Sequence, residues 1–184
     1  PGSLSPDMMN GWSANATNTG FITLMDGYGL TTTMRDRTID WDPVVVKSHE
    51  EKENEDGSIT YTVEINDNLK WNDGSKITAK DYLFYVMMRS SKQYAECEGD
   101  ATAGVELEGF SEFLDGSKKE FTGLRLLGDY KFSMTVAAEN LPNYYVLGNI
   151  GFTPLPMAAI APGTDIIDDG NGCYFNDKFT TEVL

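Results

Sequence analysis

The most regular alternation of apolar and polar residues in the chain runs from Ser58 to Ile65. Every second residue is apolar, and the residues between them are Ser, Thr or Glu. A period of two puts the apolar side chains on one face, which predicts a half-buried β-strand. Val44–Glu50 is a second extended segment, and the polar stretch between the two ends in the turn dipeptide Asp56-Gly57. The two segments are therefore predicted to form an antiparallel hairpin.

A second hairpin is predicted later in the chain. Gly123–Leu127 and Lys131–Val136 are extended segments on either side of Gly128-Asp129, which is a hairpin signal. In the second segment three apolar residues alternate with Lys, Ser and Thr. Asn72-Asp73-Gly74 predicts a further turn, between the first hairpin and the helix that follows it.

That helix begins with a capping signal. Thr78 and Asp81 are spaced as in a capping box, with Asp in place of the usual Glu or Gln. The predicted helix extends from Ala79 to Gln93, and it is apolar on nearly all sides between Tyr82 and Met88. A helix of this kind is buried on several sides, so we expect it to support the fold and not to act as a recognition helix.

Weaker patterns predict shorter elements. Val105–Leu114 has apolar residues at helical spacing and is followed by Gly116, which predicts a helix with a glycine stop. The remaining predictions are a strand or short helix at Phe21–Met25, a helical turn at Asn143–Leu147 opened by Pro142, an extended passage through Thr153–Pro156, and the start of a helix at Phe179–Leu184.

The composition limits the partners that this chain can have. Its 184 residues are 40% hydrophobic and 23% charged, within the range of globular proteins. Fourteen Lys and Arg residues against 29 Asp and Glu residues give a formal net charge of −15. An acidic surface repels phosphate, so nucleic acid is not expected as a partner, and anionic membrane surfaces are disfavoured. The longest apolar run, Tyr82–Met88, is much shorter than the about 20 residues of a membrane span.

The motifs that would carry cofactor or metal chemistry are incomplete. Gly27-Tyr28-Gly29 is followed by Thr32 where a dinucleotide fingerprint needs its third glycine, so a structural turn is predicted. His49, the one histidine, is predicted to be an ordinary strand residue. Ile167 interrupts the calcium-loop pattern in an acidic stretch near the end of the chain, which predicts a solvated loop containing Asp165, Asp168, Asp169, Asn171 and Asp177. No cofactor or metal is expected.

The residue patterns leave two classes of function open. No motif of an activated nucleophile is present, and no particular pair among the 29 acidic residues stands out as a glycosidase pair. Cys97 and Cys173 are expected to be unrelated thiols, although a disulfide is allowed. Three Trp and nine Tyr residues suit peptide or sugar recognition where they are exposed. A binding module is the first interpretation, and a secreted acidic carbohydrate-binding domain or glycoside hydrolase is the alternative.

One segment carries a specific resemblance to a known family. Between Gly57 and Tyr82 this segment resembles the family 5 extracellular solute-binding proteins, the peptide-, dipeptide- and nickel-binding components of ABC importers. It departs from them at Asn66, where the family usually has arginine. The positions in register are Tyr61-Thr62, Trp71, Asp73-Gly74 and Thr78-Ala79-x-Asp81. Further similar segments extend the resemblance over residues 21 to 162, namely Trp41–Val45, Gly123–Phe132, Pro142–Tyr145 and Thr153–Ile160.

The resemblance implies a fold and a division into domains. The fold is α+β, with a mixed, largely antiparallel sheet and flanking helices, as part of a type II periplasmic-binding-protein fold. The chain would be an N-terminal fragment of such a protein. Residues 1–27 would belong to the first lobe, residues 28–150 to the small middle domain, and residues 151–184 to the start of the return to the first lobe.

The resemblance also implies a function without catalysis. Two lobes would close on an oligopeptide or dipeptide ligand, and the closed form would bind the ABC permease subunits in the membrane. Tyr28 and Tyr94 are the ligand contacts that the resemblance suggests. The implied protein is a monomer without cofactor or catalytic residue. It would lie on the extracellular face of the cell membrane, held by a lipid anchor, or in the periplasm.

Overall fold

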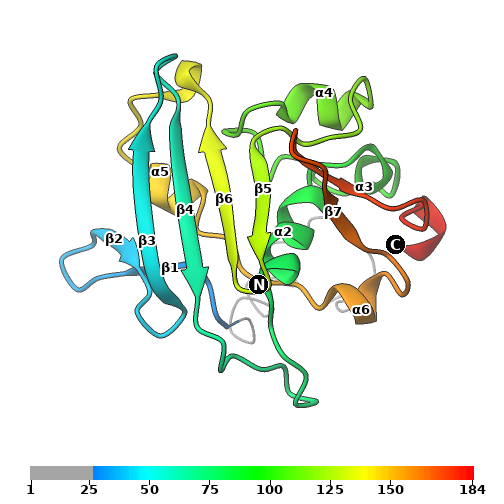
Figure 1. The fold of residues 1–184 in the computed structure, drawn as a ribbon, viewed down its shortest axis with the longest axis horizontal. Helices are drawn as coiled ribbons and strands as arrows, with labels where there is room; N and C mark the ends of the chain where they lie inside the picture. Colours follow the sequence, from blue (N-terminus) through cyan, green and yellow to red (C-terminus); the bar gives the residue numbers. More distant parts are fainter. Residues whose placement is uncertain (1–26) are drawn as a thin grey trace, which may run out of the picture.

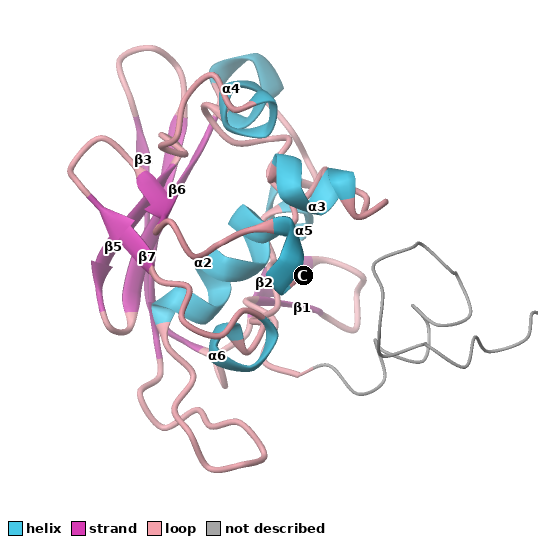
Figure 2. Cartoon of the chain, turned by 90° about the vertical axis from the view of Figure 1, so that its right-hand side faces the viewer, coloured by secondary structure: helices cyan, strands magenta, loops and turns pink. Residues whose placement is uncertain are grey.

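A four-stranded antiparallel sheet lies at the centre of the computed structural model, which describes residues 27–184 (Figure 1). The order of the strands is β3-β4-β6-β5. The helices lie on one face of this sheet (Figure 2). The predicted element at Phe21–Met25, and residues 1–26 of the predicted first-lobe segment, lie outside the described residues. The strand bounds are Val46–Glu53 for β3, Ile59–Ile65 for β4, Leu124–Gly128 for β5 and Lys131–Val136 for β6.

Both predicted hairpins are confirmed. Strands β3 and β4 pair antiparallel, with Glu53 opposite Ile59 next to the turn, and β5 and β6 pair in the same way. The third contact, β4 with β6, joins the two hairpins into one sheet, with Val63 opposite Phe132. Val63 and Phe132 are both fully buried. The apolar residues of the predicted alternation therefore lie on the inner face of one sheet, and the polar residues between them lie on its outer face.

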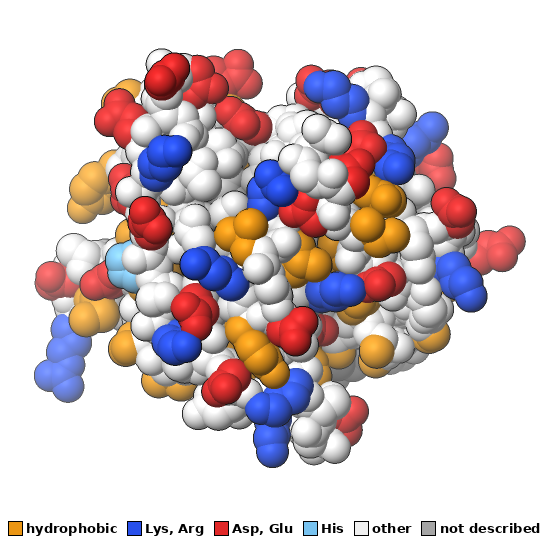
Figure 3. Space-filling view, in the orientation of Figure 1, with side chains coloured by type: hydrophobic (Ala, Val, Ile, Leu, Met, Phe, Trp, Pro, Cys, Tyr) orange, Lys and Arg blue, Asp and Glu red, His pale blue; other side chains and the backbone are white. Residues whose placement is uncertain are grey.

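Strand β3 differs from its neighbours because it carries charge along its whole length. Val46 is its only buried residue. As an edge strand with Lys and Glu side chains it is protected against pairing with other chains. Acidic and basic side chains are interspersed over the outer face of the sheet (Figure 3), where Lys47 forms an ion pair with Glu64.

Two short hairpins flank the central sheet. Strands β1 (Thr31–Thr33) and β2 (Ile39–Trp41) pair antiparallel, and so do β7 (Ile166–Asp168) and β8 (Cys173–Phe175). Trp41 at the end of β2 stacks on the His49 ring of β3, with ring centroids 5.2 Å apart. The β1–β2 hairpin thus covers part of the edge strand β3, in which Val46 is the one apolar residue.

Helix α2 (Ala79–Met88) packs on the inner face of the sheet, and its start is the predicted one. The capping box forms: the Thr78 N–H donates to Asp81 Oδ2 at 2.8 Å, and the Thr78 hydroxyl donates to the same oxygen at 3.0 Å. The Tyr82 ring stacks on Phe132 of β6 at 5.8 Å. Burial of nearly every residue of α2 agrees with its apolar sequence.

The predicted helix over Ala79–Gln93 is too long. Helix α2 ends at Met88, and a separate helix, α3 (Lys92–Glu96), begins after Ser91. The Ser91 hydroxyl donates to the Met88 carbonyl at 2.7 Å and accepts from the Tyr94 N–H at 3.2 Å. One serine therefore closes the first helix and caps the second, a role that hydrophobic periodicity does not reveal.

The predicted helix over Val105–Leu114 is correct only in its second half. Helix α4 spans Phe110–Asp115 and ends at Gly116, as expected, with φ of 78°. Its start is Gly109, whose φ of 74° is left-handed and ends any helix that comes from Val105. Leu107 instead bridges to Val136 at the end of β6. Tertiary pairing with the sheet thus prevails over the helical spacing of the apolar residues.

The remaining elements are short. The helical turn predicted at Asn143–Leu147 lies slightly later, as α5 (Val146–Asn149), and the passage through Thr153–Pro156 is free of helix and strand as predicted. The predicted helix start at Phe179–Leu184 is a single 3₁₀ turn, η2 (Thr181–Val183). The other short helices in this part of the fold are η1 (Ala138–Asn140) and α6 (Met157–Ile160).

One hydrophobic core unites the described residues. It includes side chains from the C-terminal part, such as Ile166, Cys173 and Phe179, together with those of the central sheet and α2. The assignment of residues 28–150 and 151–184 to different domains of a longer protein stays a prediction. In the described part of the chain, no helix has the length and apolar character that crossing a membrane requires.

Candidate functional site

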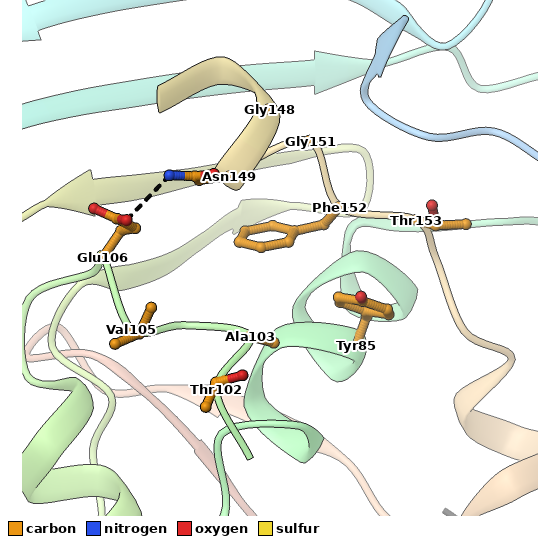
Figure 4. Close-up of a pocket in the computed structure, with 10 residues that line it drawn as sticks. All are labelled: Tyr85, Thr102, Ala103, Val105, Glu106, Gly148, Asn149, Gly151, Phe152 and Thr153. Atoms are coloured by element: carbon orange, nitrogen blue, oxygen red, sulfur yellow. Dashed lines mark hydrogen bonds between the residues drawn. The ribbon is translucent and has the colours of Figure 1, made fainter. Parts of the chain in front are cut away.

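A surface hollow of about 310 Å³ lies where α2, the segment before α4 and the segment after α5 meet (Figure 4). This volume is at the lower end of those of small-molecule sites. Its lining combines aromatic, small and polar residues. They are Tyr85, Thr102, Ala103, Val105, Glu106, Gly148, Asn149, Gly151, Phe152 and Thr153.

One wall is a loop fastened to the end of α2. The Ala103 N–H donates to the Arg89 carbonyl at 3.2 Å, and the Gly104 N–H donates to the buried Ser90 hydroxyl oxygen at 2.9 Å. A Cβ at Gly104 would come within 2.7 Å of Phe121 and of that hydroxyl, so only glycine fits there without a shift. The close approach fixes the path of residues 102–106 along the hollow.

The opposite wall is held by β1 and by Leu30, the residue before this strand. The Leu30 N–H donates to the Phe152 carbonyl at 3.0 Å, and a Cβ at Gly151 would lie 2.0 Å from Thr31 Oγ1. This packing turns the Phe152 ring toward Tyr85, with ring centroids 5.9 Å apart. In Figure 4 the Phe152 ring lies between Tyr85 and Glu106. The hollow therefore has an aromatic wall that extends toward a carboxylate.

The polar groups of the hollow come from both walls. Asn149 Nδ2 donates to Glu106 Oε1 at 3.0 Å, although 43 positions separate the two residues along the chain (Figure 4). The Arg89 guanidinium, which is not part of the lining, lies 5.2 Å from the centroid of the Tyr85 ring, and its Nη1 donates to the Tyr85 hydroxyl at 3.2 Å. The Arg89 Nε is buried without a hydrogen-bond partner among the described residues. The hollow thus has a carboxylate in its lining and a cation in contact with its aromatic wall.

Neither tyrosine predicted to contact ligand lines this hollow. Tyr28 is 39% exposed, has a left-handed φ of 64°, and accepts a hydrogen bond on its carbonyl from the Tyr82 hydroxyl at 2.6 Å. Tyr94 is 2% exposed, and its burial raises the pKa of its hydroxyl. They contact opposite ends of α2, since the Tyr94 ring lies near Arg89. Their roles as ligand contacts stay predictions.

Other residues singled out in the sequence have structural surroundings. Asp168 accepts from Arg125 Nε and from the Leu126 N–H, both at 2.8 Å, so it ties β7 to β5. Cys97 and Cys173 are free thiols. Within residues 27–184, no three His, Cys, Asp or Glu side chains gather as they would around a metal ion.

The residues that form the hollow were missed by the sequence patterns. Glu106 falls inside the helix predicted from Val105, and Asn149 just follows a predicted helical turn. The two glycines beside Asn149, Gly148 and Gly151, were a signal of close packing. Nothing in the sequence indicated which distant segment they would pack against.

Comparison with known sequences links the chain to peptide-binding proteins. No family model matches it. A dipeptide-binding protein of Lactococcus lactis subsp. cremoris (strain MG1363) is 29% identical over 107 residues, which are 55% of this chain and 18% of the relative. The chain thus matches less than a fifth of this relative's length.

Comparison with solved structures extends the similarity to nearly all of the chain. OppA of Listeria monocytogenes, solved with bound peptide, has a TM-score of 0.64 and 18% identity, and the match covers 97% of this chain and 38% of that one. A periplasmic oligopeptide-binding protein of Borrelia burgdorferi has a TM-score of 0.62 and 23% identity, with 85% of this chain and 30% of that one covered. The predicted α+β fold is thereby confirmed, and these comparisons support the resemblance read from the sequence. The chain has the fold of part of these oligopeptide-binding proteins.

Proposed function

We propose that this chain is part of the peptide-binding receptor of an ABC importer. The observation that carries the proposal is the fold, which matches a peptide-bound OppA over 97% of this chain. The sequence match to a dipeptide-binding protein over 107 residues supports it independently. The ligand would be an oligopeptide or a dipeptide.

The mechanism would be binding without chemistry. Two lobes close on the ligand by hinge motion, and the described residues supply one side of the site. The hollow fits this role because aromatic walls give contact area, while the Glu106 carboxylate and Asn149 amide supply polar partners. We infer that the chain is not an enzyme, since the proteins it resembles are binding proteins.

The partners and location follow from the same proposal. The closed receptor would bind the ABC permease subunits at the membrane. It would act as a monomer on the extracellular face of the cell, held by a lipid anchor, or in the periplasm. The net charge of −15 is compatible with this, because such a receptor need not touch anionic lipid. The alternative, a carbohydrate-binding domain or glycoside hydrolase, receives no support from the comparisons.

Calorimetric titration with a mixture of di- to pentapeptides tests the proposal. It is carried out on the 184-residue chain and on the product of the complete gene. We expect saturable binding by the complete product, and weaker or no binding by the 184 residues alone if a second lobe completes the site. Absence of peptide binding by both would overturn the proposal.

A further inference from the structure

Glu106 is the one residue of the hollow that carries a formal charge. The other nine lining residues are uncharged at neutral pH. Glu106 is a half-buried residue on the loop held against the end of α2, and its side-chain hydrogen bond to Asn149 is exposed. A ligand group that enters the hollow therefore meets a single fixed negative charge beside the Phe152 ring (Figure 4).

Asn149 orients this carboxylate. Its Nδ2 donates to Glu106 Oε1, whereas no side chain or N–H of the described residues donates to Oε2. A carboxylate held through one oxygen keeps its other oxygen as an acceptor, and an ammonium or guanidinium is its strongest partner. The geometry thus prepares Glu106 for a cationic group.

The walls of the hollow suit the stem of such a group. Tyr85, Val105 and Phe152 present apolar surface along the approach to Glu106 (Figure 4). Lysine and arginine side chains bury their methylene stems on apolar surface while the charged end reaches a polar partner. About 310 Å³ is enough space for one such side chain with its adjoining backbone.

Arg89 is a positive charge next to this hollow that opposes a cation. It is not among the residues that line the hollow, and it is already engaged by the Tyr85 ring and hydroxyl. A cationic group of the ligand would consequently gain little binding energy from the face of the Tyr85 ring. The preference for a cationic over a neutral group therefore rests on Glu106. The overall charge of −15 also favours the approach of cations.

We propose that this hollow binds the side chain of a lysine or arginine of the peptide ligand, with its charged group on Glu106. This inference rests on the proposed function, because it names the class of peptide that the receptor prefers. A neutral side chain of the same length would enter the hollow but would leave the carboxylate without a counter-ion.

The test compares two tripeptides with the same termini, Ala-Lys-Ala and Ala-norleucine-Ala, by calorimetry on the product of the complete gene. We expect the lysine peptide to bind about tenfold more tightly, as a hydrogen bond to a charged partner would give. Glu106→Gln keeps an oxygen that accepts from Asn149 but removes the charge. In this variant the two peptides should bind within about twofold of each other, with the norleucine affinity unchanged.

Glu108→Gln is the matched control. It removes the same charge two residues away, outside the hollow, and should leave the tenfold preference intact. Equal binding of both peptides by the unsubstituted protein would overturn this inference and leave the proposed function standing. A preference lost equally in Glu108→Gln would overturn it as well, since general surface charge would then explain it. Binding of neither peptide would overturn both proposals.

Discussion

At the scale of single residues, the sequence Asp-Gly-Ser recurs in three turns of the structure. It occurs at Asp56-Gly57-Ser58, Asp73-Gly74-Ser75 and Asp115-Gly116-Ser117. In each turn Asp Oδ1 accepts the serine N–H, at 2.7 to 3.0 Å, and the glycine has a positive φ between 78° and 89°. The serine hydroxyl, which donates to the same oxygen of Asp56 and of Asp73, and these N–H bonds hold the pKa of each of the three carboxyls below its ordinary value. Each turn is therefore a local unit, in which the aspartate fixes the hydrogen bonds and the glycine allows the backbone conformation.

Gly74→Ala tests the cost of this conformation. Gly74 has φ of +89°, and nothing lies within 4 Å of an added Cβ, so the substitution adds backbone strain and no clash. We expect the free energy of unfolding to fall by about 1–2 kcal/mol, measured by urea denaturation. Gly128→Ala is the control, because that glycine also has open space around it but no positive φ. Equal effects of the two substitutions would contradict this explanation.

At the scale of elements, Ser91 decides where two helices begin and end. It is 2% exposed, and its hydroxyl serves both the last turn of α2 and the first turn of α3. The break matters for the candidate site, because the residues at the end of α2 hold the loop that lines the hollow. Ala103 and Gly104 bond to Arg89 and Ser90 there.

Ser91→Ala is expected to destabilise the protein by about 1–2 kcal/mol, since it removes a helix cap and leaves buried backbone groups without partners. Chemical denaturation followed by circular dichroism measures the change. Ser111→Ala provides the comparison, as this serine is exposed on α4 and its effect should stay within about 0.5 kcal/mol. If α2 continued through residue 91 in solution, the alanine variant would be at least as stable as the parent, because alanine favours a helix interior.

At the scale of the whole molecule, residues 151–184 complete the core of the preceding segment. Phe84 of α2 has edge contacts with Phe175 and Phe179, with ring centroids 6.1 and 6.4 Å apart. Phe121 bridges to Cys173 through the backbone and is fully buried. These contacts join segments more than 50 residues apart, so the described residues are expected to unfold together.

A chain that ends at residue 150 tests this cooperativity. Without residues 151–184, Phe84 and Phe121 lose part of their cover. We therefore expect the 184-residue chain to unfold in one sharp urea transition and the shortened chain to lack it. Phe179→Ala in the 184-residue chain should retain a cooperative transition but lower its free energy of unfolding by about 3–5 kcal/mol. A shortened chain that unfolds cooperatively at the parent's midpoint would instead favour an autonomous domain at residues 28–150.

The sequence by itself determined the features whose partners lie close along the chain. The two hairpins, the Asp-Gly-Ser turns and the Thr78–Asp81 capping box depend on residues a few positions apart, so their patterns are complete in a short window. The long motif from Gly57 to Tyr82 covers the β4 strand, a turn and the start of α2, which explains why the resemblance indicated the fold. Charge and composition alone also led to the expectation that nucleic acid is not a partner of this chain.

Only the tertiary structure decided the rest, because the competing contacts come from distant segments. Leu107 lies among apolar residues at helical spacing but pairs with Val136 of β6. Tyr94, which the resemblance suggests as a ligand contact, is buried in the core. The hollow exists because Glu106 and Asn149, 43 residues apart, meet across it. A pattern along the chain cannot show such a meeting, since it depends on how two loops pack on α2 and β1.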